Sequence, residues 1–174
     1  NAAAELSSIV KDLSHVRPIS NDERLQRRHK AATLMQERGI AALILSASTS
    51  LYYFSGLSWY QSERLVGAIL TQTGQLIFIS PAFEDSKLRE TLGDQADIRL
   101  WEEDESPYEL VAQILKDEGL TGTVALDEAA PFFIADGLRM ALRSQEIVNG
   151  MLITAACRMH KSVNEIALMQ SAKN

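Results

Sequence analysis

The segment Gly39-Ile40-Ala41-Ala42-Leu43-Ile44-Leu45 decides the fold class, because an unbroken apolar run follows a glycine that is typical of a helix end. Such a run suits a strand that is covered on both faces, as in a mostly parallel sheet between helices. Upstream, Ser20 and Glu23 form a capping box, which predicts the start of a helix that ends at Gly39. The apolar face that we expect for this helix consists of Leu25, His29, Ala32 and Met35.

Helical and strand patterns alternate through the rest of the chain. Further apolar runs predict strands over 65–70, 76–79, 97–101, 123–126 and 146–148. The first two are separated by a short turn-like segment, so we expect them to form a hairpin. Helices are expected over 5–16, 81–92, 107–118 and 131–143. This alternation predicts an α/β fold, a three-layer α/β/α sandwich with a mixed sheet.

Composition and charge narrow the classes of partner. The chain has 174 residues, which is enough for one domain with a real core. Its net charge of −6 argues against a nucleic-acid partner, which would require a basic patch. No apolar run approaches the roughly 20 residues that a membrane helix needs, so we expect no membrane partner. The single cysteine, Cys157, excludes an internal disulfide framework. It fits a reducing compartment such as the cytoplasm and is also compatible with the periplasm.

The residue types that usually carry chemistry are sparse and scattered. His15, His29 and His160 have no second ligand at a metal-binding spacing, and no glycine-rich phosphate loop is present. We interpret His29 as a packed core residue and His160 as a surface residue. The acidic run Glu102-Glu103-Asp104-Glu105 is typical of a solvated loop before a helix. Cys157 is interpreted as a small buried hydrophobe. The chain is therefore expected to hold no catalytic residue and no metal.

One stretch allows both a structural and a functional interpretation. Residues 51–64 contain five of the eleven aromatic residues of the chain, placed after a predicted strand and around Gly56. They suit a loop or short helix at the carboxyl end of a strand, where ligands of open α/β sheets bind. Aromatic side chains with Arg64 would make a platform and a carboxylate clamp. The alternative is a packed aromatic cluster with no ligand, which the sequence alone favours.

The last stretch predicts a helix that begins well. Ser162 and Glu165 form a capping box, and the expected apolar face consists of Val163, Ile166, Ala167 and Met169. The helix reaches Asn174 without a glycine, a proline or a basic cluster to close it. We therefore expect this chain to be the front of a longer protein.

Three segments and one arginine carry a resemblance to a known family. The first segment reads Glu37-Arg38-Gly39-Ile40-Ala41-Ala42-Leu43-Ile44, and the second reads Leu51-Tyr52-Tyr53-Phe54-Ser55-Gly56. Arg64 follows eight residues after Gly56. The third segment reads Arg158-Met159-His160-Lys161-Ser162-Val163-Asn164-Glu165-Ile166-Ala167 and is similar to the family linker Arg-x-x-Lys-Ser-x-x-Glu-Ile. In this order the segments resemble the N-terminal domain of the creatinase, prolidase and aminopeptidase P superfamily, the M24 metallopeptidases.

The resemblance implies a ribonuclease-H-like domain whose chemistry lies in a second domain. In this family a C-terminal "pita-bread" domain binds two metal ions, for which Mn, Co or Zn are the candidates, through two Asp, one His and two Glu. No residue of this chain matches those ligands. The implied organisation is an N-terminal extension over 1–19, the creatinase/prolidase-type domain over 20–156, and over 157–174 a linker with the first helix of the catalytic domain. The implied partners are this catalytic domain, a homodimer or higher homo-oligomer, and short proline-containing peptides.

Two positions carry family roles, and a third is our addition. Tyr52 aligns with an aromatic that reaches into the neighbouring subunit's active site in aminopeptidase P relatives, which have Trp there. Arg64 aligns with an arginine that binds the substrate carboxylate across the dimer in the creatinase branch. We infer that Trp59 could replace the missing Trp as an aromatic wall.

Three functions follow as hypotheses. The first is a non-catalytic domain of an Xaa-Pro metallopeptidase, a proline-specific dipeptidase or aminopeptidase, which acts in dimerisation and in shaping substrate access. The alternative is a stand-alone peptide- or protein-binding module without peptidase activity. The third is a self-contained domain that binds a small molecule through the aromatic loop and Arg64.

Overall fold

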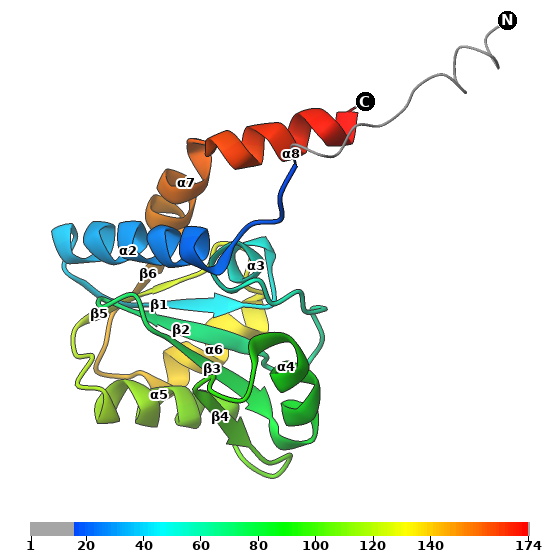
Figure 1. Ribbon diagram of the computed structural model, residues 1–174. Helices are drawn as coiled ribbons and strands as arrows, with labels where there is room; N and C mark the ends of the chain where they lie inside the picture. Colours follow the sequence, from blue (N-terminus) through cyan, green and yellow to red (C-terminus); the bar gives the residue numbers. More distant parts are fainter. Residues whose placement is uncertain (1–15, 174) are drawn as a thin grey trace, which may run out of the picture.

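The computed structural model describes residues 16–173, with the side chains of 16–172 (Figure 1). The helix expected over 5–16 lies outside the described residues, apart from its last position. A six-stranded sheet forms the centre of the molecule, in the order β4-β3-β2-β1-β5-β6. Its strands are β1 (Ile40–Ser46), β2 (Gly67–Thr71), β3 (Leu76–Pro81), β4 (Ile98–Trp101), β5 (Thr123–Leu126) and β6 (Ile147–Asn149). Strand β2 is antiparallel to both neighbours and the other pairs are parallel, so the predicted mixed sheet is confirmed.

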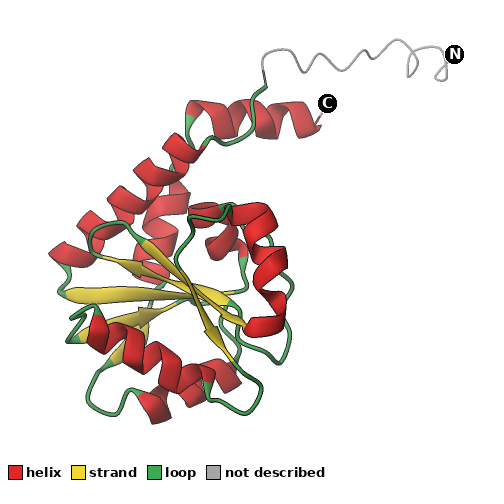
Figure 2. Ribbon diagram, turned by 60° about the horizontal axis from the view of Figure 1, so that its bottom comes forward, coloured by secondary structure: helices red, strands yellow, loops and turns green. Residues whose placement is uncertain are grey.

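Helices cover both faces of the sheet, as the layer prediction requires (Figure 2). One face carries α2 (Asn21–Glu37), α3 (Thr49–Ser55), α4 (Asp85–Leu92) and α7 (Met151–Met159). The other face carries α5 (Pro107–Asp117) and α6 (Phe132–Ala141). A short 3-10 helix, η1 (Ala82–Glu84), precedes α4, and α8 (Val163–Lys173) follows α7 away from the sheet (Figure 1). The α/β/α sandwich is therefore confirmed.

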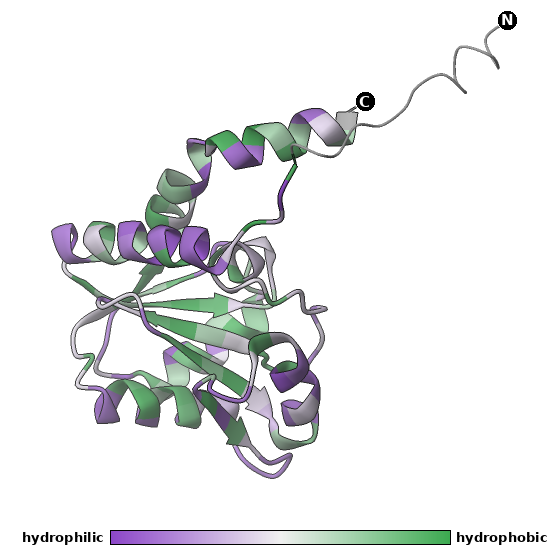
Figure 3. Cartoon of the chain, viewed as in Figure 1, coloured by the Kyte–Doolittle hydropathy of each residue, from purple (hydrophilic) through white to green (hydrophobic). Residues whose placement is uncertain are grey.

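Strand β1 is buried along its whole length, because it lies in the middle of the sheet with helices on both sides. Leu43 and Leu45 pack against the α2 face, while Ala42 and Ile44 pack against the α5 face. Colouring by hydropathy shows the same arrangement, with the apolar strands enclosed between helices (Figure 3). Among the described residues, no helix combines the length and the apolar character needed to span a membrane.

The predicted apolar face of α2 is partly wrong. Leu25 is 39% exposed and His29 is also exposed, so the interpretation of His29 as a packed core residue is wrong. The helix instead turns Arg27 and Ala31 inward, next to Ala32 and Met35. Arg27 can be buried because its charge and its donors find partners on α3 and α8, which a hydrophobic pattern cannot show.

Two helices extend the predicted element order. The stretch expected to be a loop or short helix is the helix α3, which Gly56 ends in the left-handed conformation with φ +82°. Helix α7 was not predicted, and it crosses position 156, where we place the domain boundary. The capping box at Ser162 and Glu165 is confirmed in both directions, with bonds of 3.0 and 2.8 Å.

Candidate functional site

The loops that could form a site meet at one edge of the sheet. Strands β1, β3, β4 and β5 run in the same direction, so their carboxyl ends lie along one edge, which we call the carboxyl edge. The segments that follow them there are 47–66, 82–84, 102–106 and 127–131. This edge is where open α/β sheets bind ligands.

The start of α3 is held rigidly at the carboxyl edge. The Ser48 hydroxyl caps the helix by accepting bonds from the Ser50 and Leu51 N–H groups at 3.1 and 3.2 Å. The same hydroxyl donates to the buried carboxylate of Asp127, which follows β5. Burial raises the pKa of Asp127, and the bond from Ser48 opposes this rise. Sequence reasoning missed Asp127, whose only signal is its position directly after a buried strand.

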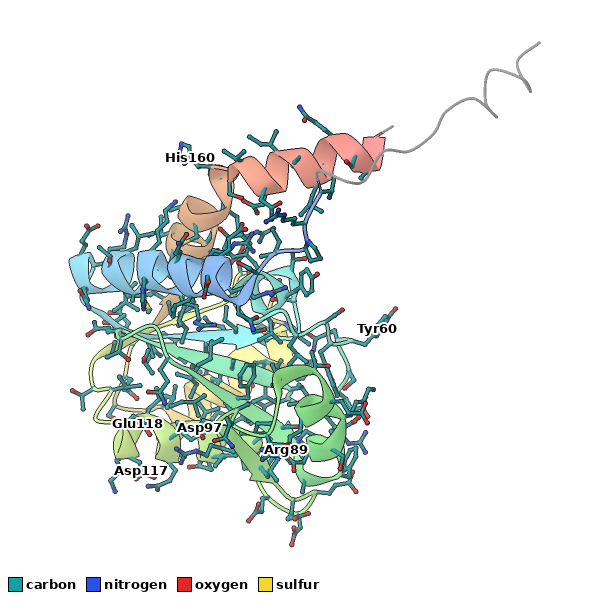
Figure 4. The ribbon with its side chains drawn as sticks, in the orientation of Figure 1. Tyr60, Arg89, Asp97, Asp117, Glu118 and His160 are labelled. Carbon is teal, nitrogen blue, oxygen red and sulfur yellow. The ribbon has the colours of Figure 1, made fainter. Side chains whose placement is uncertain are left out.

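The five aromatic residues of 51–64 divide between the two interpretations. Phe54 is fully buried, and its ring meets that of Tyr53 edge to face at 5.0 Å. The other three, Tyr52, Trp59 and Tyr60, line a shallow surface pocket of about 540 Å³. Tyr52 is 50% exposed and Tyr60 is 91% exposed, and Figure 4 shows Tyr60 projecting from the body of the domain. Part of the stretch is core, and part is a free aromatic surface.

The pocket also has polar groups and a nearby cation. Ser48, Thr49, Ser58 and Gln61 supply hydroxyl and amide groups to its lining. The ammonium of Lys87 lies 4.5 Å from the centre of the Trp59 ring, on the side of α4. Such a pocket, which we call the Tyr52 pocket, can accept a small group with an apolar part and a few hydrogen-bonding atoms.

Arg64 does not line the Tyr52 pocket. Its Nε and Nη2 donate to one oxygen of Glu103 at 3.1 and 2.7 Å, and its Nη1 donates to Glu63 at 2.5 Å. The guanidinium also lies 5.4 Å from the Phe83 ring. The hydrogen bond from Arg64 to Glu103 raises the pKa of the arginine. Arg64 is thus half-exposed at the carboxyl edge, where it forms ion pairs with the carboxylates of Glu63 and Glu103.

The predicted exposure of the acidic run and of His160 and the predicted burial of Cys157 are confirmed. Residues Glu102 to Glu105 are exposed in the loop before α5, and Glu103 pairs with Arg64. His160 is exposed where α7 ends (Figure 4), and Cys157 is buried, which raises the pKa of its thiol. Within 16–173 no three His, Cys, Asp or Glu side chains are grouped so that they could hold a metal ion.

A second polar cluster, which the sequence did not predict, links α2 to α8. Arg27 donates to Glu23 at 2.8 Å, lies 3.2 Å from Glu165, and stacks 4.1 Å above the centre of the Tyr53 ring. Glu23 also accepts a bond of 2.9 Å from the Ser162 hydroxyl. Partial burial raises the pKa of Glu23, but the bonds from Ser162 and Arg27 outweigh it, so that its pKa is lowered. We call these five residues the Arg27 cluster.

Comparison with known proteins identifies the family of this domain. Residues 27–160 match the family described as the creatinase/prolidase N-terminal domain. The chain belongs to this family. An uncharacterized peptidase of Schizosaccharomyces pombe is 30% identical over 137 residues, which cover 71% of this chain and 30% of the yeast protein. The chain thus spans less than a third of that relative's length.

Solved structures agree with the family on the fold. The dipeptidase PepE of Mycobacterium ulcerans superimposes with a TM-score of 0.75 at 24% identity, over 86% of this chain and 40% of that one. The N-terminal domain of an Xaa-Pro dipeptidase from Lactobacillus brevis gives a TM-score of 0.66 at 16% identity, over 79% of this chain and 99% of that one. The second case shows that a creatinase/prolidase N-terminal domain can be solved as a separate chain.

Proposed function

We propose that this creatinase/prolidase N-terminal domain serves an Xaa-Pro metallopeptidase by shaping the access of short peptides to a catalytic site in a following domain. The observation that carries the proposal is the exposed aromatic surface at the carboxyl edge. Tyr52 and Tyr60 are exposed there, and Arg64 lies outside the Tyr52 pocket but at the same edge of the sheet. Exposed aromatic rings with a nearby guanidinium suit the recognition of a proline ring and a carboxylate.

In this proposal Tyr52, Trp59 and Arg64 act in trans. They would complete the active site of a neighbouring subunit in a homodimer or larger homo-oligomer. The two divalent metal ions, Mn, Co or Zn, would be held by the second domain, and this chain contributes no ligand. The chain's role is to orient the peptide and to limit its length.

The proposal also assigns a partner to the exposed apolar surface of α7 and α8. Met151 and Leu152 on α7 are 54% and 66% exposed, and Met159 at its end is 69% exposed. Ile166 and Met169 on α8 continue this surface with exposures of 45% and 59%. A continuous apolar surface of this kind is typical of an interface. We propose that the protein's own C-terminal catalytic domain covers it.

Hybrid dimers of the longer protein test the role in trans. One subunit would carry Arg64→Ala and the other would lack its metal ligands, so that neither homodimer is fully active. If Arg64 acts across the dimer, mixing the two subunits restores hydrolysis of an Xaa-Pro dipeptide. If it acts within its own subunit, mixing restores nothing, and if it has no role, the Arg64→Ala homodimer is already as active as the parent.

The downstream coding sequence separates this proposal from the alternative. Two Asp, one His and two Glu in that order after Asn174 would support the peptidase. A following domain without these ligands would contradict it and favour a peptide- or protein-binding module.

A further inference from the structure

A second groove, separate from the Tyr52 pocket, lies between α2, α4 and strand β3. Its volume is about 490 Å³. Leu76, Phe78 and Leu92 give it an apolar floor. Polar side chains surround this floor, among them Arg28 on α2 and Gln95 after α4. A groove of this size and composition is large enough for a small organic molecule.

Arg28 enters this groove with unused hydrogen-bonding capacity. It is half-buried, and its Nε and Nη1 donate to the carbonyls of Gly74 and Phe54 at 3.0 and 3.4 Å. Its Nη2 has no acceptor in the described part of the chain. A guanidinium carries five N–H donors, so this side chain can still bind an anion without losing its structural bonds.

Arg24 lies one turn earlier on the same side of α2. Its Nη1 donates to the Ile19 carbonyl at 2.8 Å. Its Nε is buried and has no hydrogen-bond partner among residues 16–173. This Nε is packed against Gly56 at the end of α3, since a Cβ there would lie 2.8 Å from it, so Arg24 adds a positive charge near the groove but does not line it.

The two arginines also lack compensating charge. Within the described chain neither forms an ion pair with a carboxylate, whereas Arg27, Arg64, Arg89 and Arg99 all do. Asp97 lines the groove, but Arg99 occupies both of its oxygens at 2.6 and 3.1 Å. Burial and then the charge of Arg24 lower the pKa of Arg28. An anion in the groove would offset both the desolvation of the Arg28 guanidinium and its repulsion by Arg24.

We propose that this groove binds a small oxyanion, a carboxylate or phosphate group, through Arg28. Gln95 also lines the groove, and its amide can supply a further donor. The apolar floor accepts a short hydrocarbon part of the same ligand. The site is independent of the function proposed above, because it shares no residue with the Tyr52 pocket.

The competing explanation is purely structural. The carbonyls of Tyr53 and Phe54 end helix α3, and both receive arginine donors from α2. In that case Arg28, like Arg27, would only fix α3 and would bind nothing. A charge placed in the lining of the groove separates the two explanations, because it leaves the bonds between α2 and α3 intact.

The test is a nuclear magnetic resonance titration of the 174-residue chain with sodium phosphate and, separately, sodium acetate. Ionic strength is held constant with sodium chloride, which also serves as the reference anion. We expect saturable shifts at the Arg28 side chain, the Gln95 side chain and the Gly74 backbone. Saturation with phosphate alone assigns a phosphate group, and saturation with acetate alone assigns a carboxylate. Shifts that are linear and the same with chloride would overturn the proposal.

Three substitutions test whether the binding is specific to this groove. Gln95→Glu is isosteric and places a carboxylate in the lining of the groove, so we expect binding to weaken about tenfold. Gln26→Glu makes the same change on the exposed far side of α2, two residues from both arginines, and should bind as the parent does. Arg28→Gln should abolish saturation, but it also removes two structural bonds. Undiminished binding by Gln95→Glu would therefore overturn the proposal even if Arg28→Gln does not fold.

Discussion

The guanidinium of Arg27 on α2 lies 3.2 Å from the carboxylate of Glu165 on α8, and it is one of the few buried charges of the domain. Figure 1 shows α8 leaving the end of α7 near the N-terminal end of α2 and extending away from the sheet. The Arg27 cluster joins α8 to α2 and so helps to set the direction of α8. Anything that follows α8 in a longer chain would take its orientation from these residues.

Arg27 and Glu165 should be energetically coupled. We expect a double-mutant cycle with Arg27→Met and Glu165→Gln, measured by urea denaturation, to give a coupling free energy of about 1–3 kcal/mol. The reason is that both side chains are mostly buried, with 10% and 18% of their surface exposed. The pair Arg139 and Asp136, exposed to 72% and 40%, is the matched control and should couple by less than about 0.5 kcal/mol. Equal coupling in both pairs would contradict the importance of burial.

Acid should weaken the Arg27 cluster, because Glu23 belongs to it. The pKa of Glu23 is lowered in the folded chain from its ordinary value of 4.5. A carboxylate whose pKa is lower in the folded chain than in the unfolded chain stabilises the fold. This stabilisation is complete at pH values above the unfolded-state pKa, and it is lost as the pH falls through the folded-state pKa. We therefore expect the stability difference between the parent and Glu23→Gln to be constant above about pH 5.5 and to shrink below pH 4.5. Denaturation curves of both chains from pH 3 to 7 would measure it. A difference that grows towards low pH would contradict the assignment.

The sequence predicts the sheet well because its signals are local. The run from Ile40 to Leu45 is apolar at every position, so its burial on both faces follows without knowledge of any partner. The hairpin of β2 and β3 and the α/β alternation follow from turn residues and periodicity in the same way. The Ser162 capping box is confirmed because both of its partners lie within one helical turn.

The sequence fails where burial depends on distant partners. Arg27 is buried because Tyr53 and Glu165 receive it, and these lie 26 and 138 positions away along the chain. A hydrophobic pattern placed His29 on that face instead. The division of the aromatic stretch has the same cause, since only the packing of α3 decides that Phe54 is buried and Tyr52 is exposed. The roles of Tyr52, Trp59 and Arg64 stay predictions.

Gly67 should be essential for the central strands. A Cβ at this position would lie 2.2 Å from the backbone carbonyl oxygen of Leu45, on the neighbouring strand β1. Backbone cannot move away as a side chain can, so we expect Gly67→Ala to cost about 3 kcal/mol or more of unfolding free energy. Gly119→Ala is the control, because its Cβ would meet open space and only its φ of +66° is unfavourable, for about 1 kcal/mol. Similar losses in urea denaturation of the two variants would contradict the steric argument.

Cys157 should be inert in the native chain. It is 1% exposed, and burial raises the pKa of its thiol, so that both access and thiolate formation are suppressed. We expect its reaction with an aromatic disulfide reagent at pH 8 to be more than about tenfold slower than in the urea-denatured chain. Tyr53→Phe removes the bond of 3.0 Å from the tyrosine hydroxyl to the Cys157 carbonyl, and it should speed the reaction by loosening α7. Rapid reaction of the native parent would show that α7 opens readily.

The pairing of Arg64 with Glu103 bears directly on the proposed peptidase role. If Arg64 binds a substrate carboxylate, it must exchange Glu103 for the substrate, because one oxygen of Glu103 now accepts bonds from both its Nε and Nη2. In a longer protein with peptidase activity, Glu103→Gln should therefore lower the KM for a dipeptide about two- to fivefold, with little change in kcat. Glu102→Gln in the same exposed loop is the control, since its side chain has no ion pair in the described structure. A raised KM for Glu103→Gln would mean that Glu103 holds Arg64 in its working position and does not compete with the substrate.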